Sequence, residues 1–311
     1  MRTQGVILKQ DESDFWHMEF IPAKTILSGY RNGDQWFGEN YRMNIYKGCC
    51  HGCIYCDSRS EVYRVENFDK VRAKENALAL VARELAAKQR RGVIATGAMS
   101  DPYNPLEKEY ALTRGALELV DTSRFGISIA TKSGLITRDL EILKSIQKHS
   151  PVLVKITITA ANDLLSEKVE PYAAVSSKRF AVIRKLSESG IFAGILLMPV
   201  LPFLEDNEEN ISGIVRLAYE NKAKFIYPAF GVTLRQNQRE WYYKKLDESF
   251  PGLKARYIQQ FGNAYECLSP NLKFLWQLFQ KECNKFGVLY KMEDIIKRYT
   301  EGYGGRQLSL F

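Results

Sequence analysis

The sequence predicts an α/β fold in which a mostly parallel sheet is covered by helices. Two observations lead to this prediction. Short apolar runs alternate along the chain with longer amphipathic stretches, and the short runs are apolar throughout instead of alternating with polar residues. Strands of that kind are typical of a sheet buried on both faces. The chain of 311 residues is 45% hydrophobic and 26% charged, which fits a folded globular protein and excludes a disordered one.

Six strands are expected, one before a cysteine-rich segment and five after it. The first runs from Arg42 to Tyr46. The other five apolar runs are 92–97, 125–131, 152–158, 191–198 and 224–228. Helical patterns separate them at 70–91, 113–122, 137–148, 174–189 and 207–220. This alternation makes six βα units.

The chain divides into four expected regions. Residues 1–40 are a loop-rich lead-in with several glycine and proline breakers, and 41–235 hold the βα units. After residue 235 no further strand is expected, and 236–300 form a helical extension rich in aromatic residues that packs as a cap. Residues 301–311 have the composition of a flexible tail.

Membrane and export signals are not expected in this chain. The apolar stretch Ile191–Leu204 carries no charge, but it has 14 residues and contains Gly194, Pro199 and Pro202. A spanning helix needs about 20 residues. Charged residues also interrupt the N-terminal segment, unlike a secretory signal. We therefore expect a cytoplasmic protein with no membrane partner.

The charge balance is mildly basic. Lys and Arg number 44 against 36 Asp and Glu, a formal net charge of +8. Such an excess suits a polyanionic partner, and it suits a basic enzyme with no such partner equally well.

The cysteines carry the clearest chemical signal. Four of the six, Cys49, Cys50, Cys53 and Cys56, fall within eight residues, whereas Cys267 and Cys283 are isolated. Without an export signal, such a group indicates a metal site before it indicates a disulfide. The isolated pair is expected in the core.

The spacing C-x3-C-x2-C favours an iron–sulfur cluster. Thiolates at Cys49, Cys53 and Cys56 can bind three irons of a cubane and leave the fourth iron open to a cofactor or substrate. The alternative is zinc, with Cys50 and His51 as extra ligands. Adjacent residues rarely complete a tetrahedron, however, and the chain offers no second ligand pair at a usual spacing.

The segment 44–56, NIYKGCCHGCIYC, resembles the cluster loop of the radical S-adenosylmethionine superfamily, and in particular of proteins related to spore photoproduct lyase. Segments 96–103 (TGAMSDPY), 131–133 (TKS) and 198–202 (MPVLP) resemble the same branch. The resemblance implies a partial (β/α)6 TIM-like barrel with a C-terminal helical cap. It also implies a [4Fe-4S] cluster, S-adenosylmethionine as cofactor, a 5′-deoxyadenosyl radical that abstracts hydrogen, and an electron donor such as flavodoxin or ferredoxin.

Candidate cofactor-binding residues follow from the resemblance and from the rule that barrel chemistry gathers at the carboxyl ends of strands. Ser100 and Asp101 match positions near the amino end of S-adenosylmethionine, and Lys132 matches a lysine that pairs with its carboxylate. Thr157 or Thr159 is expected at the ribose. Tyr55 is expected beside adenine.

The resemblance is incomplete at the step that ends the radical reaction. Where the lyases place a hydrogen-donating cysteine, this chain has Ala98, and where they place a tyrosine after the third cluster cysteine, it has Asp57. A different donor is therefore expected. The candidates are Tyr103, Tyr46 and Cys267.

The last five residues, Gln307-Leu308-Ser309-Leu310-Phe311, resemble the bacterial sliding-clamp-binding peptide. Leu310 and Phe311 would serve as apolar anchors in a preformed groove, and Gln307 as a polar contact. The alternative is a tail that folds back as an apolar cap.

A basic, aromatic run at 235–256 offers a weaker indication of nucleic-acid binding. Arg235 and Arg239 are the candidates there, next to Trp241, Tyr242 and Tyr243. A solvated helix face is the commoner explanation of such a run.

Together these features predict a radical S-adenosylmethionine enzyme that acts on DNA, in repair or processing, and is recruited by the sliding clamp. One alternative is the same chemistry on RNA, a peptide or a small molecule. Another is a non-catalytic iron–sulfur or zinc module associated with nucleic acid.

Overall fold

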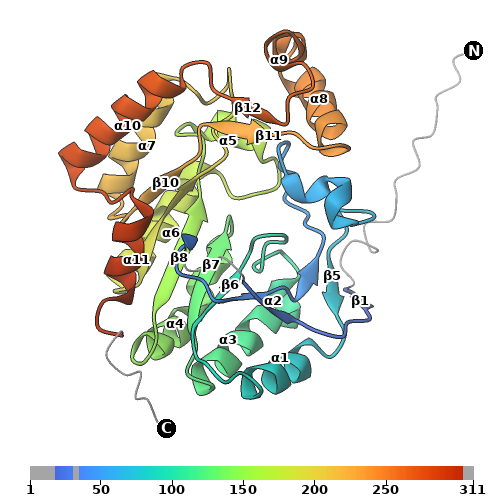
Figure 1. The fold of residues 1–311 in the computed structure, drawn as a ribbon, viewed down its shortest axis with the longest axis vertical. Helices are drawn as coiled ribbons and strands as arrows, with labels where there is room; N and C mark the ends of the chain where they lie inside the picture. The colour runs from blue at the N-terminus through green and yellow to red at the C-terminus, as the bar shows by residue number, and fades with distance from the viewer. Residues whose placement is uncertain (1–17, 31–34, 304–311) are drawn as a thin grey trace, which may run out of the picture.

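The fold is built around one seven-stranded sheet (Figure 1), seen in a computed structural model that describes residues 18–30 and 35–303. The strand order is β10-β9-β8-β7-β6-β3-β2, and every neighbouring pair except β2–β3 is parallel. The strands are β2 (Leu27–Gly29), β3 (Tyr41–Met43), β6 (Val93–Thr96), β7 (Gly126–Thr131), β8 (Val152–Thr157), β9 (Phe192–Leu197) and β10 (Ile226–Pro228). The expected six parallel strands and the partial-barrel fold class are confirmed.

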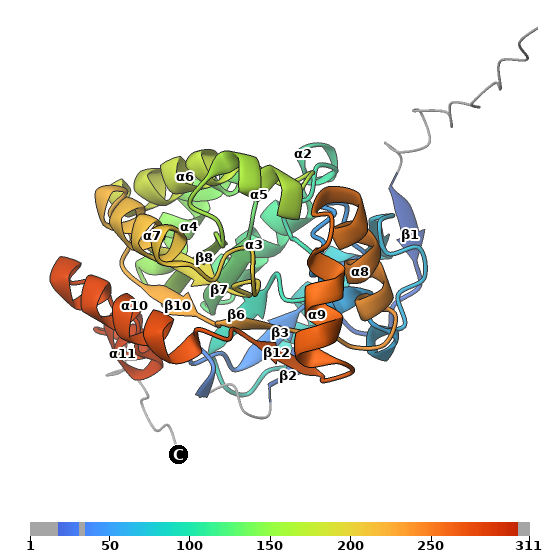
Figure 2. The same cartoon turned by 90° about the horizontal axis from the view of Figure 1, so that it is seen from above.

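Helices cover the outer face of this sheet and bury the main core. Figure 2 shows α3, α4 and α6 as an arc on one side of the strands. The helices between strands are α1 (Ala77–Ala86), α2 (Glu107–Tyr110), α3 (Leu112–Thr122), α4 (Leu140–Gln147), α5 (Asp163–Val169), α6 (Ser176–Glu188) and α7 (Glu208–Glu220). Strand residues such as Ile127, Val154 and Ile195 are fully buried in the same core as Leu117 and Ile183 of these helices. Burial on both faces explains why the strands are apolar throughout.

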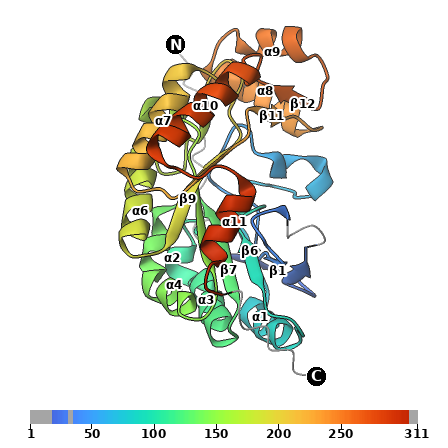
Figure 3. The ribbon, with the colours of Figure 1, turned by 60° about the vertical axis from the view of Figure 1, so that its left-hand side comes forward.

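The C-terminal extension packs on α7 and on the inner face of the sheet. It contains β11 (Gly231–Thr233), α8 (Gln238–Ser249), α9 (Leu253–Phe261), β12 (Glu266–Leu268), α10 (Leu272–Phe286) and α11 (Met292–Thr300). Figure 3 shows α10 against α7 and α11 across the sheet near β9. Ile295 and Tyr299 of α11 join Phe37 and Phe225 in a second core on the inner face. The inner face is thereby closed near α11.

The strand β4 (Tyr46–Lys47) carries the chain out of the main sheet toward the cysteines. It pairs antiparallel with β5 (Arg72–Lys74), which pairs parallel with β1 (Glu19–Ile21). The expected single strand 42–46 is therefore two short strands in different sheets. Two 3-10 helices, η3 (Asp57–Arg59) and η4 (Glu61–Tyr63), follow the cysteine loop, and η5 (Gly134–Asp139) follows β7.

Two further expectations are corrected. The expected helix 70–91 is a strand, β5, followed by α1, because Val71 and Ala73 are buried at a spacing of two whereas Ala77, Val81 and Leu85 are buried at a spacing of four. A strand also occurs after residue 235, since β12 pairs antiparallel with β11. In both places, a short strand is stabilised by a partner that is distant along the chain.

Candidate active site

The three cysteines of the C-x3-C-x2-C motif lie in the loop between β4 and η3. All three are free thiols; Cys53 is buried, and Cys49 and Cys56 are half-buried. Burial raises the pKa of Cys49 and Cys53 to about 12 and that of Cys56 to about 11. Each pKa is raised further by the charge of another thiol of the three. Metal binding at such thiols releases protons, since the ligand is the thiolate.

The described residues contain no group of three or more His, Cys, Asp or Glu side chains arranged to hold one metal ion. A cubane differs from a single ion because each thiolate binds a different iron.

The start of the cysteine loop needs a glycine. Gly48 has a φ of +81°, and a Cβ there would be 2.3 Å from the carbonyl oxygen of Lys70. The Cys49 amide donates to the Phe68 carbonyl at 2.8 Å. The chain thus enters the loop pressed against the backbone of 68–70, which no side chain at position 48 would allow.

The barrel side of the loop is held by the connection between β8 and α6. The Ile54 amide donates to the Val169 carbonyl at 3.0 Å, and the Tyr172 amide donates to the His51 carbonyl at 3.1 Å. The ring of Tyr172 covers Gly52, where a Cβ would be 2.6 Å from Cδ2 of that ring. These contacts hold the loop against the end of α5 and the segment that follows it.

The other side of the loop is held by the start of α8. Gln238 Nε2 donates to the Tyr55 carbonyl at 2.9 Å, and Asn237 Nδ2 donates to Glu61 Oε1 at 2.9 Å. The guanidinium of Arg59 stacks on the Trp241 ring at 3.8 Å. Figure 1 shows α8 beside the blue segment that contains this loop and its 3-10 helices.

Asp101 and Ser100 connect the ends of the strands to the loop. Asp101 Oδ1 accepts from the Thr131 hydroxyl at 2.7 Å, and Oδ2 accepts from the Lys132 amide at 2.8 Å. His51 Nδ1 lies 3.4 Å from the same Oδ2. The Ser100 hydroxyl donates to the Gly48 carbonyl. Both residues thus hold the loop against β6 and β7, and the expected contact with an ammonium group would be additional to these bonds.

Lys132 and Tyr55 face each other beside Cys53. Lys132 directly follows β7, and its Nζ lies 5.7 Å from the centre of the Tyr55 ring and 3.9 Å from Glu170 Oε1. The Tyr55 hydroxyl donates to the same carboxylate. Burial acts to lower the pKa of Lys132, but the charges of Cys53 and Glu170 raise it above its ordinary value. The lysine is therefore a stable cation next to the thiols.

The two threonines expected at the ribose are both buried at the carboxyl end of β8. The Thr157 carbonyl accepts from Arg179 at 2.6 Å, and the Thr159 hydroxyl donates to Glu205 Oε1 at 2.7 Å. The second oxygen of Glu205 accepts from the Leu201 amide at 2.9 Å. Burial raises the pKa of Glu205 to about 8.

The three candidate hydrogen donors lie in different elements. The Tyr46 hydroxyl donates to Glu107, and the buried Tyr103 has its pKa raised by burial and by Asp139. Cys267 is buried on β12 in the C-terminal extension. The structure does not bring the three together.

The two candidate nucleic-acid residues make contacts within the chain. Arg235 Nε lies 3.0 Å from Asp57 Oδ1, and its NH2 donates to the Tyr265 hydroxyl at 2.9 Å. Arg239 donates to three backbone carbonyls, those of Leu234, Gly262 and Ala264. Arg235 therefore links the C-terminal extension to η3, directly after the cysteine loop, and Arg239 links segments close to and within the extension. The clamp-like peptide 307–311 lies outside the described residues.

Sequence reasoning missed Glu170 and Arg179, which are each 1% exposed. Arg179 donates to Glu170 and, at 2.8 Å, to the Ser166 hydroxyl. One signal was available: Arg179 falls on the buried stripe of α6 with Ile183 and Leu186. A charged residue in such a stripe indicates a buried partner.

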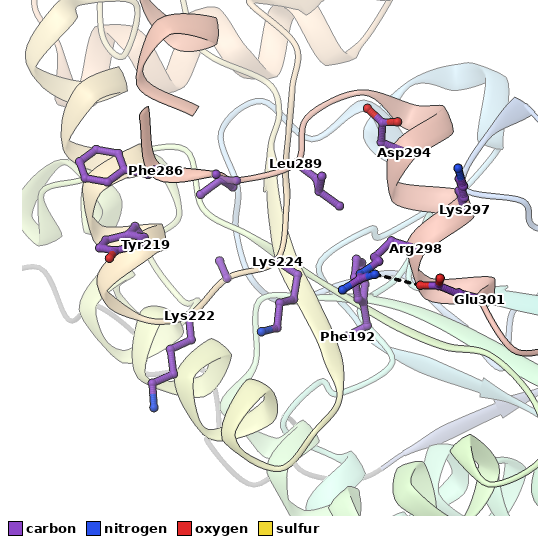
Figure 4. A pocket seen from close by; sticks show the side chains of 13 residues that line it. Phe192, Tyr219, Lys222, Lys224, Phe286, Leu289, Asp294, Lys297, Arg298 and Glu301 are labelled. Carbon is purple, nitrogen blue, oxygen red and sulfur yellow. Dashed lines mark hydrogen bonds and ion pairs between the residues drawn. The ribbon is translucent and has the colours of Figure 1, made fainter. Parts of the chain in front are cut away.

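An open groove lies apart from this site, and it shares no residue with it. It has a volume of about 740 Å³ and lies beside the starts of β9 and β10, between α7, α10 and α11. Figure 4 shows Tyr219 and Phe286 at one end, and at the other Asp294, Lys297 and Arg298 of α11 with Glu301, which follows that helix. Its lysines are on the surface, and Lys222 and Arg298 already form ion pairs. The cysteines and the strand ends therefore define the candidate active site.

The geometry agrees with the comparison to protein families. The Radical SAM superfamily model matches residues 43–214, more than half of the chain. The chain belongs to the radical SAM superfamily. That range includes the cysteine loop, Lys132 and Glu170.

Curated relatives of the chain occur in bacteria and archaea. An uncharacterized protein of Mycobacterium tuberculosis (strain ATCC 25618 / H37Rv) is 30% identical over 228 residues, which cover 71% of this chain and 67% of that protein. An uncharacterized protein of Methanocaldococcus jannaschii is 34% identical over 175 residues, which cover 55% and 64% respectively.

Among solved structures, spore photoproduct lyase complexed with dinucleoside spore photoproduct has a TM-score of 0.64 at 12% identity, covering 86% of this chain and 79% of that chain. A mutant of the same lyase with bound AdoMet has a TM-score of 0.62 at 12% identity and covers 92% and 85%. This likeness shows a shared fold. No helix of the described part of the chain has the length and apolarity needed to span a bilayer.

Proposed function

We propose that this chain is a radical SAM enzyme that holds a [4Fe-4S] cluster with Cys49, Cys53 and Cys56. The observation that carries the proposal is the group of three free thiols in one loop, at the carboxyl ends of the strands and next to the cationic Lys132. The donor set fits a cubane with an open iron, because thiolates are the usual ligands of such clusters and no fourth cysteine belongs to the motif. When bound, the cluster and S-adenosylmethionine supply a 5′-deoxyadenosyl radical that abstracts hydrogen from the substrate.

The cofactor site is proposed on the residues around this loop. Lys132 would pair with the methionine carboxylate, which is a charge-assisted contact. Tyr55 would offer a buried apolar face, since its hydroxyl is already bound to Glu170. Ser100 and Asp101 hold the loop against the strand ends, and Thr157 or Thr159 would lie near the ribose. Burial of Cys53 and Tyr55 keeps water from this side of the site.

DNA is the proposed substrate class. The support is the shared fold with a lyase whose structure holds a dinucleoside photoproduct, together with the net charge of +8. Recruitment by the bacterial sliding clamp is proposed from residues 307–311, and electrons would come from a donor such as flavodoxin or ferredoxin. Because Ala98 stands where the lyases have their donor cysteine, the proposed reaction ends with a different hydrogen donor.

The test is release of 5′-deoxyadenosine by anaerobically reconstituted, dithionite-reduced protein, with ultraviolet-damaged DNA, with undamaged DNA and with none. We expect release that rises with damaged DNA. Release that ignores DNA would move the proposal to another substrate, and a reconstituted protein with zinc and no labile sulfide would overturn it.

Clamp recruitment has a separate test. We expect the intact chain to be retained by immobilised sliding clamp, and both a chain lacking 307–311 and the Leu310→Ala/Phe311→Ala variant to lose retention. Equal retention of all three would remove the clamp from the proposal and leave the chemistry unaffected.

A further inference from the structure

Three charged side chains form a largely buried group beside Tyr55, which lies between Cys53 and Cys56 in the cysteine loop. Glu170 lies at its centre: Oε1 accepts from the Tyr55 hydroxyl and lies 3.9 Å from Lys132 Nζ, and Oε2 accepts from Arg179. Glu170 and Arg179 are each 1% exposed and the Lys132 side chain is 18% exposed. We call Lys132, Glu170 and Arg179 the buried charge group.

The group is attached to the barrel at several points. Arg179 donates to the Thr157 carbonyl at 2.6 Å and to the Ser166 hydroxyl at 2.8 Å. The Lys132 amide donates to Asp101 at 2.8 Å. The charges are therefore fixed relative to the cysteine loop, and among the described residues Glu170 is the carboxylate that forms ion pairs with both cations.

The group lies against the part of the loop that holds Cys53 and Cys56. Tyr55, between these two cysteines in the sequence, donates its hydroxyl to Glu170, and its ring centre lies 5.7 Å from Lys132 Nζ. The amide of the neighbouring Ile54 donates to the carbonyl of Val169, next to Glu170, at 3.0 Å. Charges this close and this buried interact strongly because little water screens them.

We propose that the buried charge group sets the reduction potential of the iron–sulfur cluster, with Glu170 as the positioning residue that holds Lys132 near the cluster and offsets part of its charge. The inference rests on the proposed function only in requiring a cluster on the three cysteines. One-electron reduction by an external donor adds one negative charge to the cluster. A neighbouring cation stabilises that reduced form and raises the potential, whereas a neighbouring anion lowers it.

The test compares the midpoint potentials of variants that each remove one charge, measured in the absence of S-adenosylmethionine. Lys132→Gln should lower the midpoint potential and Glu170→Gln should raise it, as measured by dithionite titration followed by electron paramagnetic resonance. Lys132→Arg, which keeps the charge, should stay near the potential of the unmodified protein. A residue with a merely structural role would not give shifts of opposite sign.

Matched controls lie on α5, a few residues before Glu170. Glu167 and Lys168 are exposed, so Glu167→Gln and Lys168→Gln make the same charge changes in water. Their potentials should not move, and the shifts of the buried variants should persist at high salt.

The outcomes separate this inference from the proposed function. If the unmodified protein takes up no iron and sulfide, the proposed function fails. If clusters form in full but Lys132→Gln leaves the potential unchanged or raises it, the inference is overturned and the proposed function stands. Should Glu170→Gln fail to fold, the Lys132→Gln and Lys132→Arg pair still decides the matter.

Discussion

The two sides of the cysteine loop differ in how they hold it. On the barrel side the contacts are buried and charged, with Lys132, Glu170 and Arg179 close to Cys53. On the extension side the ion pair of Arg235 with Asp57 is about one third exposed, at 31% and 35%. Buried charges respond strongly to what is bound beside them, and exposed ones do not. The barrel side is therefore suited to influencing chemistry at the cysteines, and the extension side to holding the loop in place.

The largest expected effect concerns the loop itself. Cys53→Ser should lose most of the reconstituted iron and labile sulfide, because it removes the most buried of the three proposed ligands. Cys50→Ser, three positions earlier and outside the C-x3-C-x2-C motif, should keep them. Iron, sulfide and zinc are measured together. Equal loss in both variants would contradict the three-cysteine assignment and favour a site that uses Cys50.

The second effect is the loss of unfolding free energy when a glycine is replaced by alanine in the barrel or in the C-terminal extension. Gly97 directly follows β6 and has a φ of +97°, and a Cβ there would be 1.9 Å from the Ala130 carbonyl oxygen. Gly252, which precedes α9, has a φ of +85° and nothing within 4 Å of a Cβ. Gly97→Ala should cost about 3 kcal/mol or more of unfolding free energy. Gly252→Ala should cost about 1–2 kcal/mol, from backbone strain alone.

Denaturant unfolding measures both changes. Equal costs would mean that the end of β6 can move away from β7. The close packing of Gly97 against Ala130 would then not be needed for stability.

The third effect is a pH dependence on the barrel side. The folded state raises the pKa of Glu205 to about 8 from an ordinary value of 4.5, chiefly by burial. Between those values the folded protein binds a proton at this site that the unfolded chain has released, so stability falls as pH rises, by at most about 1.4 kcal/mol per pH unit. Glu205→Gln should remove this decline.

The measurement is unfolding free energy from pH 5 to pH 8 for both proteins. Asp206, whose pKa is also raised by burial, remains in both and serves as the internal control. Parallel pH curves would show that Glu205 is ionised in the folded protein.

Sequence patterns predict the parts of this molecule that depend on neighbouring residues. The βα alternation predicts the parallel strands, and the cysteine spacing predicts the loop at their ends. Glu170 is different, because its partner Tyr55 is 115 positions away and the bond exists only once β8 and the loop are assembled. The strand β12 was not predicted for a similar reason. It has three residues, of which only Cys267 is buried, and such a strand is too short to show a period-two pattern.

The smallest expected effect tests the extension side. Arg235→Gln breaks the partly exposed ion pair with Asp57, so it should cost no more than about 1 kcal/mol of unfolding free energy. Arg298→Gln, which breaks the pair with Glu301 where both side chains are 65% exposed, is the control and should cost less. Cluster content and midpoint potential should stay unchanged in both. A shifted midpoint potential in Arg235→Gln alone would mean that the C-terminal extension also acts on the cluster. The two sides of the loop would then not differ in function.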